Sequence, residues 1–392
     1  MSSEVRRLCI VTPHHLSVTG GGAEYQIECL IEALAAEQRY EIFYLARSAE
    51  PSCRPAGYRV VRIGTRIQAS RFGYAMDAVP LYRALRSLRP QVIYQRVACG
   101  YTGICAWYAR RSGARLIWHV AHDTDVMLER LDPGRNPVRG FLETTCIEYA
   151  IRHANHIITQ TEHQARLLRH NYGREADGVI RNFQPNPTEE IDKSGPLTVL
   201  WVANFKRWKQ PELFVALADA LRDLDSVRFV MAGASAGGSG TADWNAAVMA
   251  QIRQARNLDY LGPLPQTEIN RLFAHAHIFV NTSKWEGFPN TFIQAWMREV
   301  PVVSLSVDPD QLLAHGNMGI VAENPGALSS AVRALIMDPA RRAEYGERAR
   351  RYAMREHSLE NIKTLQRLID TGSLQACGAP PCDRPRLETS RF

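Results

Sequence analysis

The sequence lacks several features that would assign a chain of 392 residues to common classes of protein. No stretch approaches about 18 uninterrupted apolar residues, which excludes a typical membrane-spanning helix. The first residues hold no long apolar region of the signal-peptide kind, so we expect a cytoplasmic protein. Zinc-finger patterns, aromatic stacking platforms and long basic runs are also missing, so we expect no binding to nucleic acid.

The eight cysteines lack the close spacing that a metal site would need. Several of them lie in apolar runs, where cysteine acts as a small core residue. We therefore expect reduced thiols and no structural metal.

The dinucleotide fingerprint G-x-G-x-x-G is missing, which argues against a Rossmann dehydrogenase. Glycine is nevertheless concentrated at residues 20–22, between a predicted strand at Arg7–Thr12 and a predicted helix at Ala23–Glu37. Glycines at such a point let a phosphate or a sugar approach the backbone closely. A flexible turn would explain them equally well.

The composition is that of a globular protein, with 45% hydrophobic and 22% charged residues. The length suggests two domains. Strands and helices alternate along both halves, which predicts parallel sheets with helices on both faces. The segment 183–196, rich in proline and charge, is the predicted linker. A net charge of +7 suits an anionic substrate or membrane surface, and an ordinary basic enzyme would carry it too.

The most informative stretch is residues 276–304, whose pattern predicts a strand, a loop, a helix and a strand. The loop spans Thr282–Pro289, and Asn290 is the predicted N-cap of the following helix. A strand that ends in a polar loop and leads into a helix is where open α/β sheets bind anionic ligands. Glu286 in the loop and Gln294 in the helix can therefore reach one ligand.

This stretch resembles the donor-sugar signature of the family-4 retaining glycosyltransferases. In that signature a Glu-Gly-Phe loop is followed, eight residues after the Glu, by a second Glu that leads into Ala. The residues here are Glu286-Gly287-Phe288 and Gln294-Ala295. Gln294 departs from the family Glu and would hold ribose hydroxyls more weakly than a charge-assisted hydrogen bond. The resemblance implies transfer of a sugar from a nucleotide donor, with retention at the anomeric carbon.

The loop Asn204–Lys209 resembles the diphosphate-binding segment of the same family. Lys209 matches the family Lys, whereas Asn204 replaces the family Arg. Lys206 or Arg207 could supply the missing charge, so that the cations clamp a diphosphate. A solvated basic turn is the alternative explanation.

Two segments of the first half also resemble the family. His122 ends a predicted strand where family members often carry a His close to the donor sugar. His119, three residues earlier, is the competing candidate, and strand alternation places the two on opposite faces. Gly21 and Gly22, shortly before Ala23-Glu24, match the N-terminal loop that faces the donor phosphates.

Residues and resemblance together predict an α/β protein of the GT-B fold, in which two Rossmann-like parallel-sheet domains face a central cleft. The predicted catalytic residues are His122, Glu286 and Lys209. The predicted donor-binding residues are Gly21, Gly22, Asn204, Lys206, Arg207, Gly233, Gly287, Phe288, Pro289, Asn290 and Gln294. We expect no metal and no cofactor, because cations at the leaving diphosphate can replace a metal ion.

The predicted domain boundaries follow the linker. Residues 1–186 form the predicted acceptor-side domain, and residues 187–357 form the predicted nucleotide-sugar domain. A helix at 358–372 is expected to cross back onto the first domain, and the tail 373–392 is expected to be disordered.

The predicted function is transfer of a sugar from a UDP- or GDP-sugar to a glycan or lipid-linked acceptor, in polysaccharide or glycoconjugate synthesis. The arginines between Arg47 and Met76 could meet an anionic acceptor at the inner membrane face, and ordinary solvation explains them as well. Two alternatives stay open. One is a nucleotide-sugar 2-epimerase, and the other is a degenerate nucleotide-sugar-binding protein, favoured by Asn204 and Gln294.

Overall fold

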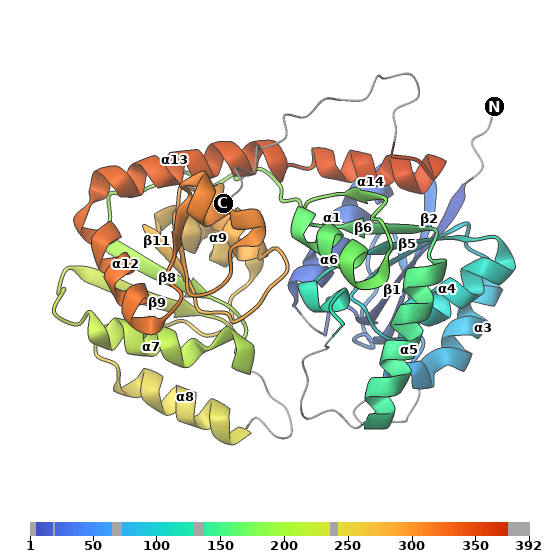
Figure 1. The fold of residues 1–392 in the computed structure, drawn as a ribbon, viewed down its shortest axis with the longest axis horizontal. Coiled ribbons are helices and arrows are strands. Elements are labelled where there is room, and N and C mark those ends of the chain that lie inside the picture. The colour runs from blue at the N-terminus through green and yellow to red at the C-terminus, as the bar shows by residue number, and fades with distance from the viewer. Residues whose placement is uncertain (1–4, 19, 65–72, 129–136, 236–241, 375–392) are drawn as a thin grey trace.

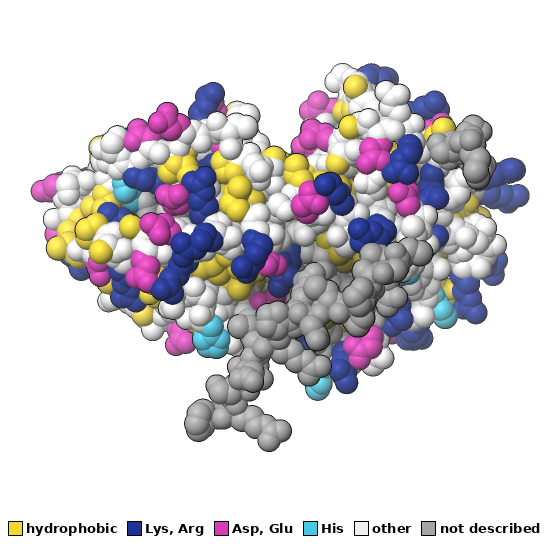
Figure 2. Space-filling model, turned by 90° about the horizontal axis from the view of Figure 1, so that it is seen from above, with side chains coloured by type: hydrophobic (Ala, Val, Ile, Leu, Met, Phe, Trp, Pro, Cys, Tyr) yellow, Lys and Arg dark blue, Asp and Glu magenta, His cyan; other side chains and the backbone are white. Residues whose placement is uncertain are grey.

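The computed structural model describes residues 5–18, 20–64, 73–128, 137–235 and 242–374. These residues form two lobes, each built on a parallel sheet with helices on both faces (Figure 1). Seen from the side of α13 and α14, the lobes are separated by a notch, and Lys and Arg side chains are spread over both (Figure 2). The predicted fold of two Rossmann-like domains is confirmed.

The first sheet has the strand order β3-β2-β1-β4-β5-β6-β7 in the described residues. Its strands are β1 (Arg6–His14), β2 (Tyr40–Ser48), β3 (Arg59–Arg62), β4 (Val92–Arg96), β5 (Arg115–His119), β6 (His156–Thr159) and β7 (Gly178–Val179). Its helices are α1 (Gly22–Ala35), η1 (Tyr74–Asp77), α3 (Ala78–Leu88), α4 (Gly100–Ser112), η2 (Asp123–Asp125), α5 (Pro137–His153) and α6 (Glu162–Tyr172), where η marks a 3-10 helix.

The second sheet has the strand order β10-β9-β8-β11-β12-β13. Its strands are β8 (Leu197–Val202), β9 (Val227–Ala232), β10 (Leu258–Tyr260), β11 (Ile278–Asn281), β12 (Val302–Ser304) and β13 (Gly319–Val321). The helices are η3 (Arg207–Lys209), α7 (Pro211–Ala220), α8 (Ala242–Gln254), α9 (Gln266–His275), α10 (Asn290–Trp296), η4 (Pro309–Gln311), α11 (Leu312–Gly316), α12 (Pro325–Met337), α13 (Pro339–Glu356) and α14 (Glu360–Thr371).

In each sheet the chain first adds strands on one side of the first strand and then continues on its other side. This switch point predicts where a ligand binds. In the first sheet β1 lies between β2 and β4, and in the second sheet β8 lies between β9 and β11. Ligands of open α/β sheets bind outside the carboxyl ends of the strands at such a switch point. The loops after β1, β5, β8 and β11 meet there, and we call this region the junction.

Apolar side chains on both faces of each sheet hold the layers together. The strands are rich in Val and Ile, as expected for strands that are buried on both sides. Trp118, Trp201 and Trp296 are fully or almost fully buried in these clusters. Each such side chain contributes about 2–3 kcal/mol by its burial.

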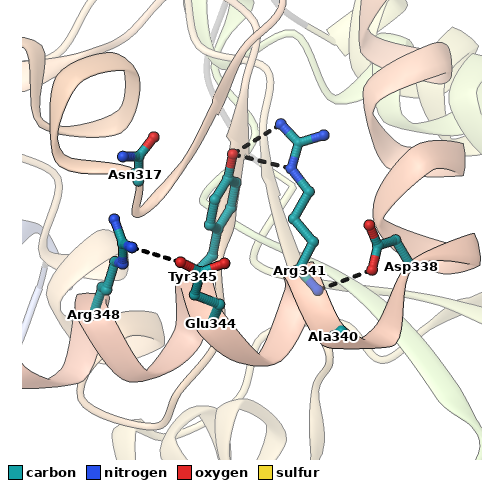
Figure 3. A pocket seen from close by; sticks show the side chains of 7 residues that line it. All are labelled: Asn317, Asp338, Ala340, Arg341, Glu344, Tyr345 and Arg348. Atoms are coloured by element: carbon teal, nitrogen blue, oxygen red, sulfur yellow. Dashed lines mark hydrogen bonds and ion pairs between the residues drawn. The ribbon is translucent and has the colours of Figure 1, made fainter.

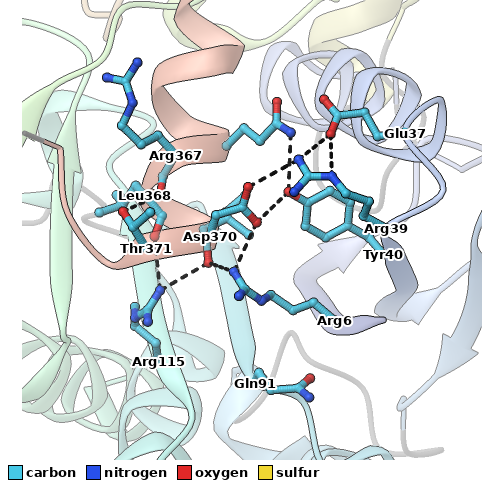
Figure 4. Close-up of polar contacts among 12 residues, drawn as sticks. Arg6, Glu37, Arg39, Tyr40, Gln91, Arg115, Arg367, Leu368, Asp370 and Thr371 are labelled. Atoms are coloured by element: carbon cyan, nitrogen blue, oxygen red, sulfur yellow. Dashed lines mark hydrogen bonds and ion pairs between the residues drawn. The ribbon is translucent and has the colours of Figure 1, made fainter. Parts of the chain in front are cut away.

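The helix α14 follows α13 and lies on the first domain (Figure 1). Leu365, Leu368 and Ile369 are buried in one cluster with Leu8 and Ile10 of β1. At the end of α14, Asp370 accepts hydrogen bonds from Arg6 Nη1 at 3.0 Å and from the Tyr40 hydroxyl at 2.7 Å (Figure 4). The chain thus returns to the domain where it began. The expected disorder of the tail lies mostly outside the described residues.

The structure adds a strand that the sequence did not predict, and it shows contacts made by the predicted linker 183–196. The short edge strand β3 was missed, because its four residues carry exposed arginines at both ends. The predicted linker 183–196 is fixed by contacts: Phe183 is fully buried, and the Lys193 Nζ donates to the Phe273 carbonyl at 3.1 Å.

His357, between α13 and α14, is buried where the two domains meet. Its Nδ1 donates to the Asn182 carbonyl at 2.7 Å, and its ring lies 4.5 Å from that of Phe288. Its Nε2 has no hydrogen-bond partner among the described residues. Burial lowers the pKa of His357 to about 3, so the ring is neutral in the folded protein.

Replacing His357 is expected to flatten the acid side of the stability profile. The unfolded chain takes up a proton on this His below its ordinary pKa of 6.5, whereas the folded chain does not until about pH 3. Stability is therefore lost as the pH falls from 6.5, by about 2 kcal/mol at pH 5. Urea unfolding at pH 7 and pH 5 should show that His357→Asn loses about 2 kcal/mol less than the wild type.

The exposed His275 provides the matched control for this measurement. His275→Asn should keep the wild-type dependence on pH. An equal loss of stability in the wild type and in His357→Asn would contradict the assignment.

Candidate active site

The centre of the junction is an ion pair between Lys209, at the end of η3, and Glu286, in the loop after β11. The Lys209 Nζ donates to Glu286 Oε1, and the Ser283 hydroxyl donates to the same oxygen at 2.8 Å. Burial alone would raise the pKa of Glu286, but Lys209, Ser283 and His122 outweigh it, and the pKa is lowered. Glu286 is therefore a carboxylate at neutral pH.

Hydrogen bonds between the two loops set the position of this pair. The Trp201 Nε1 donates to the Thr282 hydroxyl at 2.9 Å, and that hydroxyl donates to the Lys209 carbonyl at 2.6 Å. The Lys284 amide donates to the Trp208 carbonyl at 2.8 Å. The loop after β8 and the loop after β11 are thus joined side by side, which brings Lys209 to Glu286.

Lys206 and Glu24 extend the pair into a cluster of alternating charges. Burial lowers the pKa of Lys206 and nearby Lys209 lowers it further, while Glu24 and Glu286 oppose the shift. Burial raises the pKa of Glu24, and Lys206 and Arg96 oppose that shift. Lys206 therefore lies within electrostatic reach of Lys209 and of one carboxylate from each domain.

Arg207 lies apart from this cluster. Its guanidinium stacks over the Trp244 ring of α8 at 5.6 Å. Lys206, whose Nζ lies 5.0 Å from the centre of the Trp208 ring, stays close to Lys209. Of the two residues expected to replace the family Arg, Lys206 is the one that the structure places at the junction.

His122 faces Glu286 from the first domain. It is the N-cap of η2, and its Nδ1 accepts the Thr124 amide at 3.2 Å. The ring proton of neutral His122 is therefore on Nε2, which can donate to a ligand. His122 also lowers the pKa of Glu286, so the two side chains are within electrostatic reach.

His119, the competing candidate, has a structural position instead. Its Nε2 donates to the Ile180 carbonyl at 3.1 Å. Its Nδ1 accepts from the Tyr94 hydroxyl at 2.9 Å and from Arg96 Nη1 at 3.2 Å. Burial and the charge of Arg96 keep the pKa of His119 well below its usual value, so this His is neutral and its nitrogens are occupied.

Gly287 brings the backbones of the two domains into contact. A Cβ at this position would lie 2.7 Å from the Ala121 carbonyl oxygen and 3.2 Å from the His122 Cα. It would also lie 3.1 Å from Gln164 Nε2. Only glycine allows the loop of Glu286 to approach the loop of His122 this closely.

Asn290 does not cap its own helix, contrary to the prediction. The N-cap of α10 is Pro289, without a side-chain hydrogen bond. The Asn290 Nδ2 donates to the Gly22 carbonyl at 2.9 Å, and its Oδ1 accepts from Asn182 and Gln26 at 3.1 and 3.3 Å. The Asn290 side chain therefore bonds across the junction: its amide group donates to α1, and its oxygen accepts from α1 and from the segment after β7.

Gly21 and Gly22 lie at the start of α1, and each lies against the end of a polar side chain. A Cβ on Gly21 would lie 2.2 Å from Glu24 Oε2, and a Cβ on Gly22 would lie 2.8 Å from Asn290 Nδ2. Gly21 therefore allows the Glu24 carboxylate to lie close to the backbone, and Gly22 allows Asn290 of the second domain to do so. Whether they also contact a donor stays a prediction.

Asn204 links three loops. Its Nδ2 donates to the Gly20 carbonyl at 3.1 Å, and its Oδ1 accepts the Ala234 amide at 3.3 Å. The neighbouring Gly233 donates to the Gly262 carbonyl at 2.8 Å, with φ of 146°. A Cβ on Gly233 would lie 1.9 Å from the Ala203 oxygen, so this position requires glycine.

Three predicted donor-binding residues have side chains turned toward protein. The Gln294 Nε2 donates to the Asn270 Oδ1 of α9 at 3.3 Å, rather than pointing to the Glu286 loop. Phe288 is buried in the core of the second domain, and Pro289 is buried beside it. A donor contact by Phe288 or Pro289 would therefore come from the backbone.

Aspartates near the junction accept hydrogen bonds from backbone amides. The prediction of no metal relied in part on the absence of an Asp-x-Asp motif, but the sequence contains three such triplets: Asp123-Thr124-Asp125, Asp223-Leu224-Asp225 and Asp308-Pro309-Asp310. Asp125 Oδ2 accepts the amides of Ala121 and His122 at 2.8 and 3.0 Å. Asp310 accepts the first amides of α6, from the other domain. In the described part of the chain, no group of three His, Cys, Asp or Glu side chains could hold a metal ion.

Sequence reasoning missed Glu24 and Arg96 as members of the site. The signal for Glu24 was the Ala23-Glu24 pair after the glycines, which was used only to align the loop. Arg96 gave no local signal, because its side chain reaches His119 and Asn182 only after folding.

Comparisons with known proteins agree with this geometry. Residues 21–182 match the glycosyl transferase 4-like domain, and residues 196–338 match the glycosyl transferases group 1. The two matches together span more than half of the chain. The chain therefore belongs to the family-4 glycosyltransferases of the GT-B fold.

A curated relative and two solved structures are consistent with this family. The D-inositol 3-phosphate glycosyltransferase of Corynebacterium glutamicum is 21% identical over 289 residues, which is 68% of this chain and 69% of the relative. Sucrose-phosphate synthase from Thermosynechococcus elongatus superposes with a TM-score of 0.74 at 15% identity, covering 94% of this chain and 100% of that one. Anabaena HepE in complex with UDP-glucose superposes with a TM-score of 0.71 at 17% identity, covering 93% and 98%.

Gly287→Ala is expected to push the two loops of the junction apart. The new Cβ meets backbone atoms of the first domain, which cannot move aside as a flexible side chain could. Transferase activity should fall about tenfold or more, and small-angle X-ray scattering should report a larger radius of gyration.

Gly326→Ala, in α12, is the matched control, because its Cβ would come no closer than 3.4 Å to a neighbouring atom. Wild-type activity and dimensions in Gly287→Ala would argue against the close contact.

Proposed function

We propose that this glycosyltransferase moves a sugar from a nucleotide-sugar donor to a glycan or lipid-linked acceptor, with retention at the anomeric carbon and without a metal ion. The observation that carries the proposal is the Lys209–Glu286 pair, placed next to His122 across the junction. The pathway we propose for the product is polysaccharide or glycoconjugate synthesis.

The donor proposed is a UDP- or GDP-sugar. HepE, a structural neighbour, was solved with UDP-glucose, and another structure of HepE holds UDP and glucose. The loop after β8 offers Lys206 and Lys209 side by side, which suits a diphosphate. The loops that hold Gly233 and Gly262 lie next to it and provide a place for the base.

The charges at the junction suit the cleavage of a sugar–phosphate bond. As the bond breaks, positive charge develops on the sugar ring and negative charge on the leaving diphosphate. Lys209 and Lys206 stabilise the diphosphate without a metal ion. Glu286, ionised at neutral pH, accepts hydrogen bonds from the sugar hydroxyls, and His122 donates from its Nε2 on the opposite side.

The acceptor binds on the side of the first domain in this proposal. A lipid-linked acceptor would require peripheral contact with the inner membrane face, for which the arginines between Arg47 and Met76 are the candidates, with ordinary solvation as the alternative explanation. Arg47 pairs with Asp77, and Arg62 donates to the Glu50 carbonyl at 2.7 Å. Arg66 and Arg71 lie outside the described residues. Among the described residues, no helix is both long and apolar enough to cross a bilayer.

The two alternatives receive less support than the transferase. The family matches cover both domains and name glycosyl transferases in each. The degenerate-binding alternative rested on Asn204 and Gln294, and both side chains bond to protein groups. Asn204 and Gln294 differ from the residues of the family pattern, but this difference does not separate Lys209, Glu286 and His122.

Release of nucleoside diphosphate from one donor is the first expected outcome. The purified protein is incubated with UDP-, GDP-, ADP- and dTDP-sugars, and the released nucleoside diphosphate is quantified. One donor should be hydrolysed slowly, and Glu286→Ala should reduce the rate about 100-fold or more, because the sugar loses its charged partner. Once an acceptor is found, the anomeric configuration of the product, read by NMR, should match that of the donor.

Glu268→Ala, an exposed carboxylate on α9, is the control for this loss of charge. No release and no thermal shift with any nucleotide would overturn the proposal.

Lys209→Ala is expected to lower kcat about 100-fold, because the leaving diphosphate loses a cation in a water-poor site. The activity of the wild type should stay within about twofold after treatment with a chelator, since lysines take the place of a metal ion. The assay is steady-state kinetics with the donor identified in the panel. Loss of activity with the chelator, restored by added Mg²⁺ or Mn²⁺, would contradict the metal-free mechanism.

A further inference from the structure

One stretch of the first domain carries positive charge without any negative charge. Residues 78–122 contain no Asp, Glu or Lys, whereas the whole chain has 47 basic and 40 acidic residues. The arginines of this stretch are Arg83, Arg86, Arg89, Arg96, Arg110, Arg111 and Arg115. Arg96 belongs to the junction, and Arg86, Arg89, Arg111 and Arg115 line one other surface.

Five arginines gather in one open cavity of about 790 Å³. It lies where α3 and α4 end and where β1, β4 and β5 begin, on the edge of the first sheet opposite to the junction. Its basic residues are Arg6, Arg86, Arg89, Arg111 and Arg115, and Tyr82 and Tyr108 line it as well. We call it the basic pocket. No carboxylate lines it within the described residues.

Most of these charges are not neutralised. In the described ranges, Arg86, Arg89 and Arg111 form no ion pair. Arg111 is held flat over the Trp107 ring at 4.5 Å, which orients its guanidinium without removing its charge. Arg86, Arg89 and Arg111 are all exposed, so a ligand can reach them.

The floor of the pocket is anchored by α14. Arg115 Nη1 donates to the carbonyls of Leu368 and Ile369 at 3.1 Å each, and Arg6 pairs with Asp370 (Figure 4). Burial lowers the pKa of Arg115, and the charge of Arg6 lowers it further. Of the five arginines, Arg6 is the one with a carboxylate partner in the described structure.

A second cavity, in the other domain, shows what a compensated surface looks like. It measures about 520 Å³ and is lined by residues of α13 and its surroundings (Figure 3). Arg348 pairs there with Glu344, Arg341 Nη2 donates to the Tyr345 hydroxyl at 2.8 Å, and Asp338 caps the helix. Each of its charged side chains has a hydrogen-bond or ion-pair partner within the protein, and carboxylates line it together with the arginines.

We propose that the basic pocket binds a phosphate-bearing anion at a site separate from the donor. Guanidinium groups match phosphate oxygens in pairs, and several arginines aimed at one cavity select multiply charged ligands. The volume lies in the range of small-molecule sites. The phosphate belongs either to a free ligand or to the headgroup of an anionic lipid. The proposal does not depend on the transfer reaction.

The first arm of the test uses tripolyphosphate as the free ligand. Isothermal titration calorimetry at about 50 mM salt is run in a Lys209→Ala background, so that the donor site does not take the probe. The double variant Arg86→Ala/Arg111→Ala should weaken binding about tenfold or more. The control Arg348→Ala/Arg351→Ala removes the same charge from exposed ion pairs of α13 and should bind as the parent does.

The second arm uses vesicles of phosphatidylcholine with one-third phosphatidylglycerol. Sedimentation that is lost in Arg86→Ala/Arg111→Ala and kept in the control would identify a lipid headgroup as the source of the phosphate. Tripolyphosphate binding with the same pattern would identify a free ligand. The proposal would be overturned if the protein bound neither probe. It would also be overturned if the two double variants lost binding equally. Neither result bears on whether the junction releases nucleotide.

Discussion

The ion pair of Lys209 and Glu286 is the interaction on which the junction depends. A buried carboxylate is costly unless a cation and a hydrogen-bond donor compensate it, and Glu286 has both in Lys209 and Ser283. This compensation requires the loop after β8 to lie against the loop after β11. The Trp201–Thr282–Lys209 chain of hydrogen bonds holds them there. The same contacts fix the orientation of Glu286 toward the first domain, so loop packing and site geometry have one physical cause.

Several contacts where the two domains meet are polar. Asn290 bonds to Gly22 and Asn182, and Asp310 accepts two amides at the start of α6. Such groups can exchange protein partners for water when the domains separate, which an apolar core could not do at low cost. Gly287 adds a steric condition, because the closed arrangement exists only without a side chain there. The contact between the loops of Gly287 and His122 is therefore specific in geometry.

The parts of the site that could be predicted from sequence are those fixed by local structure. Glu286, Lys209 and His122 each follow directly from a strand end, and strand ends of parallel sheets meet at one edge. Gln294 and Asn290 were misplaced because their partners, Asn270 and Gly22, are brought near only by packing between elements. Arg96 had no local signal for the same reason. The strand β3 was missed because an edge strand of four residues with two arginines lacks the apolar alternation that marks a strand.

The two basic regions of the chain differ in how their charge is balanced, and this difference bears on what each can bind. At the junction, Lys206 and Lys209 lie near Glu24 and Glu286, so carboxylates balance the positive charge of these two lysines when no ligand is bound. In the proposed function, a diphosphate bound there would take the place of carboxylates at the lysines, and this would free Glu286 for the sugar. Binding and the orientation of Glu286 are thereby coupled, and a simple anion that brings no sugar gains less from the exchange. The basic pocket has no such internal competitor in the described structure, so its affinity should follow the charge of the ligand alone.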